Sequence, residues 1–529
     1  MTRNRTGILA VALLAVGACQ DLDVVNENNP DTERALAEPA EVENVLRSAF
    51  NIWFDRFDFS DLYAYFPLIA DEMTQTWTQR DIQPSIEPRP ALKNDPLAEE
   101  VWIPRGPWDG WNSVLANSND GLRRIKEGLR IITLDPGATE TTDNTDRAWA
   151  WGKFWQGTGM GYAALSMDRT VPGTEETVLP ESYDELVAFE RENLRTYDEV
   201  MPVAIASLEE AIARIDASEP FTTPATWVNN QPLTSAQLRE LANSMIARLL
   251  VYNARTPEER EAVDWQKVIA HTADGLTFDF GPTLQSGIVT STFLNRLQST
   301  TRMRADNRLV GPADVSGAYQ EWLAKPLAER DRFDIVTPDR RITGPTPSSR
   351  GAYFRYRAPT DNNGFNTTRG LYNFSNYQWY RKNGASSSGQ HVVFSADENR
   401  LLRAEAMLRT GNLQEAANLI NVSRTRTVRI GSTNYQGLPA VTADGVPQSA
   451  TCVPRTETGA CGSLMDALRY ERQIELAGTD PMRAWFDYRG FGQLVTGTPL
   501  MMPIPARYLV SMGLPLYTFG GVGGDGAAQ

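Results

Sequence analysis

Apolar side chains recur at helical spacing in two neighbouring stretches of this chain. Within the first stretch, successive apolar residues are four and three positions apart. They are Met201, Ile205, Leu208, Ile212 and Ile215. That period places them on one face of a helix, and residues 238–252 carry a stripe of comparable length. Because each stripe needs an apolar partner, we expect an antiparallel helical hairpin and a mainly α-helical fold.

Signals for the start of a helix accompany these stripes. Thr234-Ser-Ala-Gln237 and Ser395-Ala-Asp-Glu398 both have the capping-box pattern. The second of them opens two shorter apolar stripes separated by Gly411, which we expect just beyond the end of a helix. Helix pairs with short turns, and with alanines where the helices would touch, predict tetratricopeptide-like packing, although no fixed repeat length is present.

Other stretches predict further helices and loops. We expect helices at residues 40–57, at 108–132 and from about residue 146, where several glycines weaken the pattern unless they permit close helix packing. Repeated prolines predict that residues 81–107 form a loop. Residues 276–394 are rich in Gly, Ser, Thr, Asn, Arg and aromatic residues, and they predict a loop-rich insertion with short strands. Loops displayed on a rigid frame often carry binding residues.

The N-terminus has the layout of an export signal. A basic segment precedes the apolar run 8–18, which ends at Cys19. The run is too short to span a bilayer, since a spanning helix needs about 20 apolar residues. Val-Gly-Ala-Cys resembles a bacterial lipobox, in which the cysteine becomes an acylated N-terminus; an ordinary secretory signal with an incidental cysteine is the alternative. We expect a signal peptide over 1–18, a tether over 19–36, and membrane attachment through acyl chains such as palmitate on Cys19.

Composition argues against several classes of function. The formal net charge of −15 opposes contact with phosphate backbones, so we expect no nucleic-acid partner. The chain has only two histidines, His271 and His391, for which we expect solvated or capping roles. No nucleophile elbow, zinc-protease motif or Walker loop is present, and we assign no catalytic residue, metal ligand or cofactor. Cys452 and Cys461 are expected to form a local disulfide, because two thiols supply only half of a zinc ligand set.

Five segments, in order along nearly the whole chain, resemble the SusD/RagB family of outer-membrane nutrient-binding lipoproteins. They are Cys19-Gln-Asp-Leu-Asp-Val with Asn28-Asn-Pro30, residues 108–117, residues 402–421 with Arg424 and Arg426, residues 471–476 with Arg483, Asp487 and Arg489, and Pro503-Ile-Pro505. One such motif is weak, whereas five in the same order are strong. Departures at 478–483 and 149–172 indicate a divergent branch.

The resemblance implies a non-enzymatic lipoprotein on the outer face of the outer membrane. Such a protein binds nutrient oligosaccharides and delivers them to a SusC-like TonB-dependent transporter. It also implies a helical N-terminal part over 37–275, an insertion over 276–394 that holds the possible ligand-binding face, and a helical C-terminal part over 395–529. Three alternatives stay open: a lipid-anchored glycoside hydrolase with two carboxylates, a helical scaffold that binds only protein, and a peptide-binding nutrient receptor.

Aromatic side chains on loops are the candidate ligand contacts, because they offer rigid apolar surfaces to the C–H faces of sugars. The candidates are Trp102, Trp322, Trp77, Tyr319, Tyr353, Tyr356 and Trp379. For each of them, packing in the core is the favoured alternative. Trp102 and Trp322 rank first, because their polar or proline-rich neighbours should make full burial harder.

The charged residues of the C-terminal motifs predict a structural network. Glu405 lies on an apolar stripe, where an unpaired carboxylate would be costly, so we expect an arginine partner. Arg472 and Glu475 are spaced for contact along one helical face, and Arg483, Asp487 and Arg489 are candidates to extend the network. We expect these groups to maintain the fold or contact the transporter.

Overall fold

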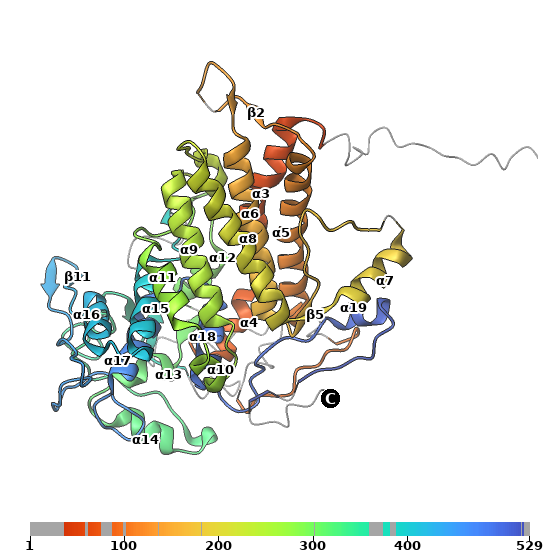
Figure 1. The fold of residues 1–529 in the computed structure, drawn as a ribbon. Coiled ribbons are helices and arrows are strands. Elements are labelled where there is room, and N and C mark those ends of the chain that lie inside the picture. Colours follow the sequence, from red (N-terminus) through yellow and green to blue (C-terminus); the bar gives the residue numbers. More distant parts are fainter. Residues whose placement is uncertain are drawn as a thin grey trace, which may run out of the picture.

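Helices dominate the computed structural model of the chain (Figure 1). The residues that the structure describes are 36–58, 62–75, 87–98, 102–135, 137–180, 182–300, 302–358, 374–380, 388–519 and 521–522. Cys19, nearly all of the expected tether and Trp77 lie outside these ranges. Strands within them form short antiparallel pairs, so the predicted mainly α-helical fold with short strands is confirmed.

The α-helices are α3 (Pro39–Asp58), α4 (Leu62–Ile69), α5 (Trp102–Lys126), α6 (Thr145–Ser166), α7 (Tyr183–Asn193), α8 (Tyr197–Ala217), α9 (Ser235–Tyr252), α10 (Pro257–Glu261), α11 (Trp265–Ala273), α12 (Thr292–Gln298), α13 (Asn307–Val310), α14 (Ala318–Ala324), α15 (Ala396–Arg409), α16 (Leu413–Arg424), α17 (Leu464–Leu476), α18 (Arg483–Phe491) and α19 (Ala506–Ser511). The strand pairs are β1 (Met73–Gln75) with β7 (Met303–Ala305), β2 (Ile132–Thr133) with β3 (Thr142–Asp143), β4 (Arg169–Thr170) with β5 (Arg195–Thr196), β6 (Thr283–Gln285) with β10 (Ser388–Gln390), β8 (Phe354–Tyr356) with β9 (Tyr377–Trp379), and β11 (Val428–Ile430) with β12 (Thr433–Tyr435). None of the helices in the described ranges is both long and apolar enough to cross a membrane.

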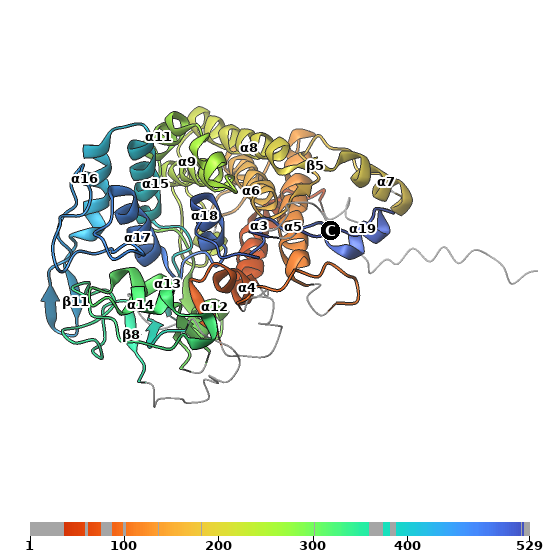
Figure 2. The ribbon, with the colours of Figure 1, turned by 90° about the horizontal axis from the view of Figure 1, so that it is seen from below.

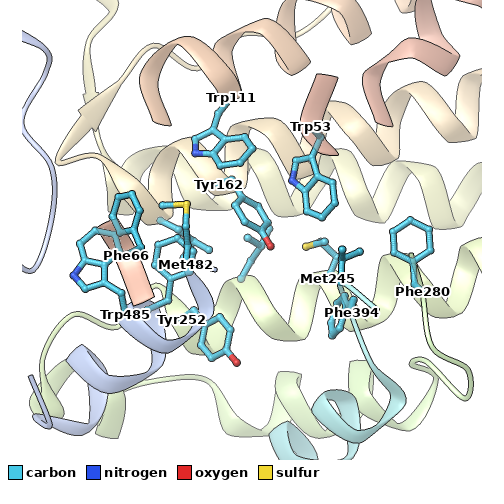
Figure 3. Packing of buried hydrophobic residues seen from close by; sticks show 14 of the residues in the cluster. Trp53, Phe66, Trp111, Tyr162, Met245, Tyr252, Phe280, Phe394, Met482 and Trp485 are labelled. Atoms are coloured by element: carbon cyan, nitrogen blue, oxygen red, sulfur yellow. The ribbon is translucent and has the colours of Figure 1, made fainter. Parts of the chain in front are cut away.

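Helix α6 is the centre of a bundle that also contains α3, α5, α8 and α9. Its glycines permit close packing, as the sequence suggested. A Cβ on Gly157 would lie 2.6 Å from the Ala204 carbonyl oxygen of α8. The resulting core is aromatic, and Figure 3 shows Trp53 and Trp111 beside Tyr162, with ring centroids 5.9 and 5.1 Å from that tyrosine.

Both predicted helical hairpins are present. Helices α8 and α9 are antiparallel, since Asp216 near the end of α8 pairs at 2.9 Å with Arg239 near the start of α9. The Thr234 capping box that starts α9 is formed as predicted. Helices α15 and α16 make the second hairpin, and Gly411 between them has a φ of +82°, a left-handed conformation that suits glycine.

The boundaries of α5 differ from the prediction at both ends. The helix begins at Trp102, inside the region expected to be loop, and contains Pro104 and Pro107. Pro104 lies in the first turn, where backbone N–H groups have no partner within the helix and a missing N–H costs nothing. The helix ends at Lys126 because Gly128 adopts a φ of +104°.

A buried ion network joins α15, α17 and α18 to α10, with Glu405 at its centre. As predicted, Glu405 has arginine partners: it lies 2.7 Å from Arg260 and 2.8 Å from Arg472. Asp487 contacts the same two arginines at 2.9 and 2.8 Å. These guanidiniums hold the pKa of Glu405 below its ordinary value although burial alone would raise it.

Two details of the predicted network are wrong. Arg472 does not contact Glu475 along the helix, because Glu475 accepts a hydrogen bond of 3.0 Å from Arg341 instead. Arg489 donates to the backbone carbonyls of Leu500 and Tyr252 rather than to a carboxylate. The partner of Glu475 is Arg341, which belongs to the loop-rich insertion. Spacing along one helix does not reveal such a partner.

The two histidines are more enclosed than expected. His391 is 1% exposed, with its ring 5.6 Å from that of Phe54, so the expected solvated or capping role is wrong. His271 is half-buried at the end of α11, and its Nδ1 lies 2.8 Å from the Asn243 side-chain oxygen. Burial lowers the pKa of His271.

Candidate functional site

A cleft of about 970 Å³ opens between segments that are far apart in the sequence. We call it the central cleft; residues 70–71, 87–89, 308–327, 454–473 and 488–497 contribute to its walls. Its volume is typical of a site for a small ligand or an oligosaccharide. The helices that contribute to it, among them α13, α14, α17 and α18, can be located in Figure 2.

One face of α17 forms a polar wall of the central cleft. Asp466, Arg469, Tyr470 and Gln473 line it, and their spacing of three, one and three residues places them on a single side of the helix. Arg469 is half-buried and keeps its guanidinium beside the Phe491 ring, 4.7 Å from the centroid. Tyr470 donates its hydroxyl to buried Asp339 at 2.6 Å, so the half-buried Asp466 and Arg469 and the exposed edge of Gln473 are the polar groups that this wall offers to a ligand.

Another part of the lining of the central cleft contains carboxylates that are already paired. Asp71 lies 2.7 Å from Arg89, and Glu87 lies 3.1 Å from Arg308. Burial raises the pKa of Asp71, an effect that the adjacent arginines only partly offset. These carboxylates and arginines form ion pairs with one another. Their charges are therefore largely neutralised before a ligand binds.

A loop closed by a disulfide forms the rim of the central cleft. Cys452 and Cys461 are joined by an S–S bond of 2.00 Å, and residues 454–458 between them face the cleft. The Arg455 backbone N–H donates to the Pro312 carbonyl at 2.8 Å, and the Gln320 side chain donates to the Thr456 carbonyl at 2.9 Å. The sequence indicated the disulfide but not the position of this loop on a cleft.

Trp322, which ranked first among the candidate aromatics with Trp102, is 2% exposed. The expectation that its polar neighbours would prevent burial is wrong, because those neighbours cover it. The guanidinium of Arg330 lies 4.4 Å from its ring centroid, and that of Arg308 lies 5.6 Å away. Tyr319 lines the central cleft, but it is only 5% exposed and packs on Trp322.

The remaining described candidates lie at the start of α5 and at the β8–β9 pair. Trp102 is half-buried at the start of α5, next to Tyr65. The Tyr353 hydroxyl donates to buried Glu475, and the half-buried Tyr356 hydroxyl donates to Asp334 at 3.0 Å. Trp379 is 8% exposed and lines a separate cavity of about 70 Å³. The structure thus brings Tyr319 to Trp322, and it places Tyr353, Tyr356 and Trp379 on or next to the β8–β9 pair. All of these side chains except Tyr356 are buried. The whole predicted set stays a prediction as ligand contacts.

A second cleft, of about 720 Å³, lies beside the β2–β3 hairpin. It includes Trp149, which sequence reasoning did not single out, and whose ring centroid is 5.4 Å from the Lys153 amine and 5.9 Å from the Arg214 guanidinium. Figure 1 shows β2 at the top of the molecule and α14 at the bottom, so the two clefts are at opposite ends. Trp149 lies on a helix whose other residues are nearly all buried, and no local signal marked it as different.

Comparison with known proteins identifies the architecture. No family model matches the sequence, and no curated protein matches it. Among solved structures, a SusD superfamily protein from Parabacteroides distasonis is 13% identical, with a TM-score of 0.54 over 90% of this chain and 98% of its own. One from Bacteroides fragilis is 14% identical, with a TM-score of 0.52 over 90% and 98%.

A third similar structure is the surface glycan-binding protein A from Bacteroides uniformis. It is 15% identical, with a TM-score of 0.50 over 88% of this chain and 92% of its own. The resemblance that the five sequence segments indicated is therefore confirmed at the level of the fold. The chain has the SusD-like fold over nearly all of its length.

Proposed function

We propose that this chain is a surface-exposed outer-membrane lipoprotein that captures oligosaccharides in the central cleft and delivers them to a SusC-like TonB-dependent transporter. The observation that carries the proposal is the SusD-like fold, shared with a protein named as a surface glycan-binding protein. The export signal ending at Cys19 supports a lipid-anchored location. The volume and polar lining of the central cleft support the ligand class.

The chemistry of the central cleft suits a ligand rich in hydroxyl groups. Thr456, Thr458, Gln473 and Thr496 line it and supply both donors and acceptors. Tyr319 and Tyr470 are too deeply buried to offer a full ring face for stacking. We therefore expect hydrogen bonds, more than stacking, to provide the affinity in this cleft.

A binding role fits the cleft better than glycoside hydrolysis. A hydrolase needs one carboxylic acid and one carboxylate free to act on the glycosidic bond. Asp71 and Glu87 are instead held by Arg89 and Arg308, and Asp466 accepts hydrogen bonds from Ser463. Among the described carboxylates that line the cleft, the exposed Glu457 therefore lacks a second free carboxylate to act with. We expect the protein to bind its glycan without cleaving it.

Calorimetry on the soluble Cys19→Ala chain with a panel of oligosaccharides tests the proposal. We expect binding by at least one glycan class, weakening on Gln473→Ala in the central cleft and no change on Thr142→Ala in the second cleft. The mixtures should contain no shorter products after incubation. Appearance of such products supports the hydrolase alternative, and binding of peptides in place of glycans supports the peptide receptor.

A further inference from the structure

We propose that the ligand of the central cleft carries an anionic group, a carboxylate or a sulfate, and that Arg455 on the disulfide-closed loop recognises it together with Arg469 on α17. This inference rests on the proposed function and specifies its ligand class. It would make the protein a receptor for acidic oligosaccharides, such as those that contain uronic acids.

The arginines of the central cleft fall into two kinds. Arg89 and Arg308 are neutralised by close carboxylates at 2.7 and 3.1 Å. Among the described residues, Arg455 has no carboxylate oxygen within 4.0 Å, and its guanidinium donates at 2.7 Å to the Ala450 carbonyl. For Arg469, the carboxylate within that distance is Asp466, at 3.9 Å. Arg455 also donates to the Gly459 carbonyl and Arg469 to the Phe491 carbonyl, both at 3.4 Å. Neither guanidinium has a carboxylate closer than 3.9 Å among the described residues, so both keep a positive charge for a ligand.

Arg255 and Arg489 also donate to backbone carbonyls, but both are buried in the core, whereas Arg455 and Arg469 are half-buried and line a cleft. Acidic residues outnumber basic ones, 66 to 51, and the buried guanidiniums of Arg248, Arg260 and Arg472 are paired closely with carboxylates. A half-buried guanidinium without a close carboxylate on a cleft wall is accessible to an anionic ligand. Its planar fork of donors matches a carboxylate or a sulfate in a bidentate geometry.

The loop holds Arg455 in place before any ligand arrives. The Cys452–Cys461 bond closes it at a Cα separation of 5.6 Å. The Arg455 N–H is fixed to the Pro312 carbonyl, and the neighbouring Thr456 carbonyl is fixed to Gln320. Because these contacts order the backbone in the free protein, binding costs less conformational entropy than with an open loop.

Glu457 on the same loop provides an internal control. It is exposed and also lines the central cleft, so its charge opposes an anionic ligand but would favour an amino sugar. Glu457 is exposed, so ordering its side chain on binding costs more conformational entropy than ordering the half-buried side chain of Arg455. The geometry therefore favours the anionic ligand, and the two residues predict opposite effects of substitution.

The test uses the soluble Cys19→Ala chain and two probes, a galacturonic-acid oligosaccharide and a neutral galactose oligosaccharide of the same length. We expect the acidic probe to bind at least about tenfold more tightly, consistent with a charge-assisted hydrogen bond. Arg455→Ala and Arg469→Ala should each weaken the acidic probe by a larger factor than the neutral one. Glu457→Gln should strengthen the acidic probe.

Arg429→Ala, on the exposed β11–β12 hairpin, removes the same charge away from the cleft and should change neither affinity. Arg455→Lys keeps the charge and protects against misfolding of the loop; we expect an intermediate loss. Equal affinity for the two probes, or weakening by Glu457→Gln, overturns the anionic specificity while the proposed function stands. Failure of every glycan to bind overturns both.

Discussion

Replacing Glu405 by Gln tests the physical account of the fold at its most enclosed charge. The carboxylate is 0% exposed and accepts hydrogen bonds of 2.9 and 2.7 Å from Arg260 and 2.8 Å from Arg472. Each charge-assisted hydrogen bond contributes about 1.5–3 kcal/mol. In Glu405→Gln the side-chain amide oxygen still accepts some of these hydrogen bonds, but the negative charge is lost. Removing one partner of a buried pair costs about 3–5 kcal/mol, because two guanidiniums then share Asp487 alone.

The expected loss in the free energy of unfolding for Glu405→Gln is therefore about 3–5 kcal/mol at pH 7. Urea unfolding followed by tryptophan fluorescence measures it. Glu209→Gln is the matched control, because Glu209 pairs with Lys267 at 2.8 Å on the surface, where such pairs contribute about 0–1 kcal/mol. A loss for Glu405→Gln no larger than that for Glu209→Gln would refute the reasoning.

The same variant predicts a dependence on pH. Because the arginines lower the pKa of Glu405 in the folded state, its contribution is complete above the unfolded value of about 4.5 and is lost as the pH falls through the folded value. The difference between wild type and Glu405→Gln should therefore shrink in acid. A difference that stays constant from pH 7 into the acid range would contradict this assignment.

Three further outcomes follow from the structure. Trp322→Ala should lower the free energy of unfolding by about 3–5 kcal/mol in a urea titration, since the ring is buried beneath Arg330; an unchanged stability would contradict that burial. Burial raises the pKa of Glu72 to about 7 despite Arg483, so wild-type stability should fall as the pH rises from about 4.5 to 7, by up to about 3 kcal/mol. Unfolding of Glu72→Gln across that range should lack this component, and identical pH profiles would refute it. Cys19→Ala should release soluble, folded protein that binds glycan but no longer supports uptake, as fractionation and growth assays measure; continued membrane attachment would exclude lipidation at Cys19.

The helical hairpins and their caps could be predicted from sequence, because their determinants are local. The stripe from Met201 to Ile215 needs only its own period, and the Thr234 cap forms with a residue three positions away. The arginine partner of Glu405 could also be predicted, because Glu405 lies on an apolar stripe. The identity of Arg260 as a partner was not, because it lies 145 residues away.

The candidate site could not be predicted from the sequence, because its residues are also far apart along the chain. The central cleft combines segments near residues 70, 310 and 455, and no spacing within one segment reveals such a meeting. Trp322 shows the converse error, since its polar neighbours were interpreted as a sign of exposure but cover the ring. Arginine and tryptophan pack well together, so polar neighbours alone do not establish that an aromatic side chain is exposed.

Isothermal calorimetry of the soluble chain with oligosaccharides tests the central claim most directly. Saturable binding of a glycan, weakened by Gln473→Ala in the central cleft and unaffected by Thr142→Ala in the second cleft, is the result that we predict. Absence of binding across neutral and acidic glycans, or binding that Gln473→Ala leaves intact while Thr142→Ala abolishes it, would contradict the assignment of the central cleft as the glycan site.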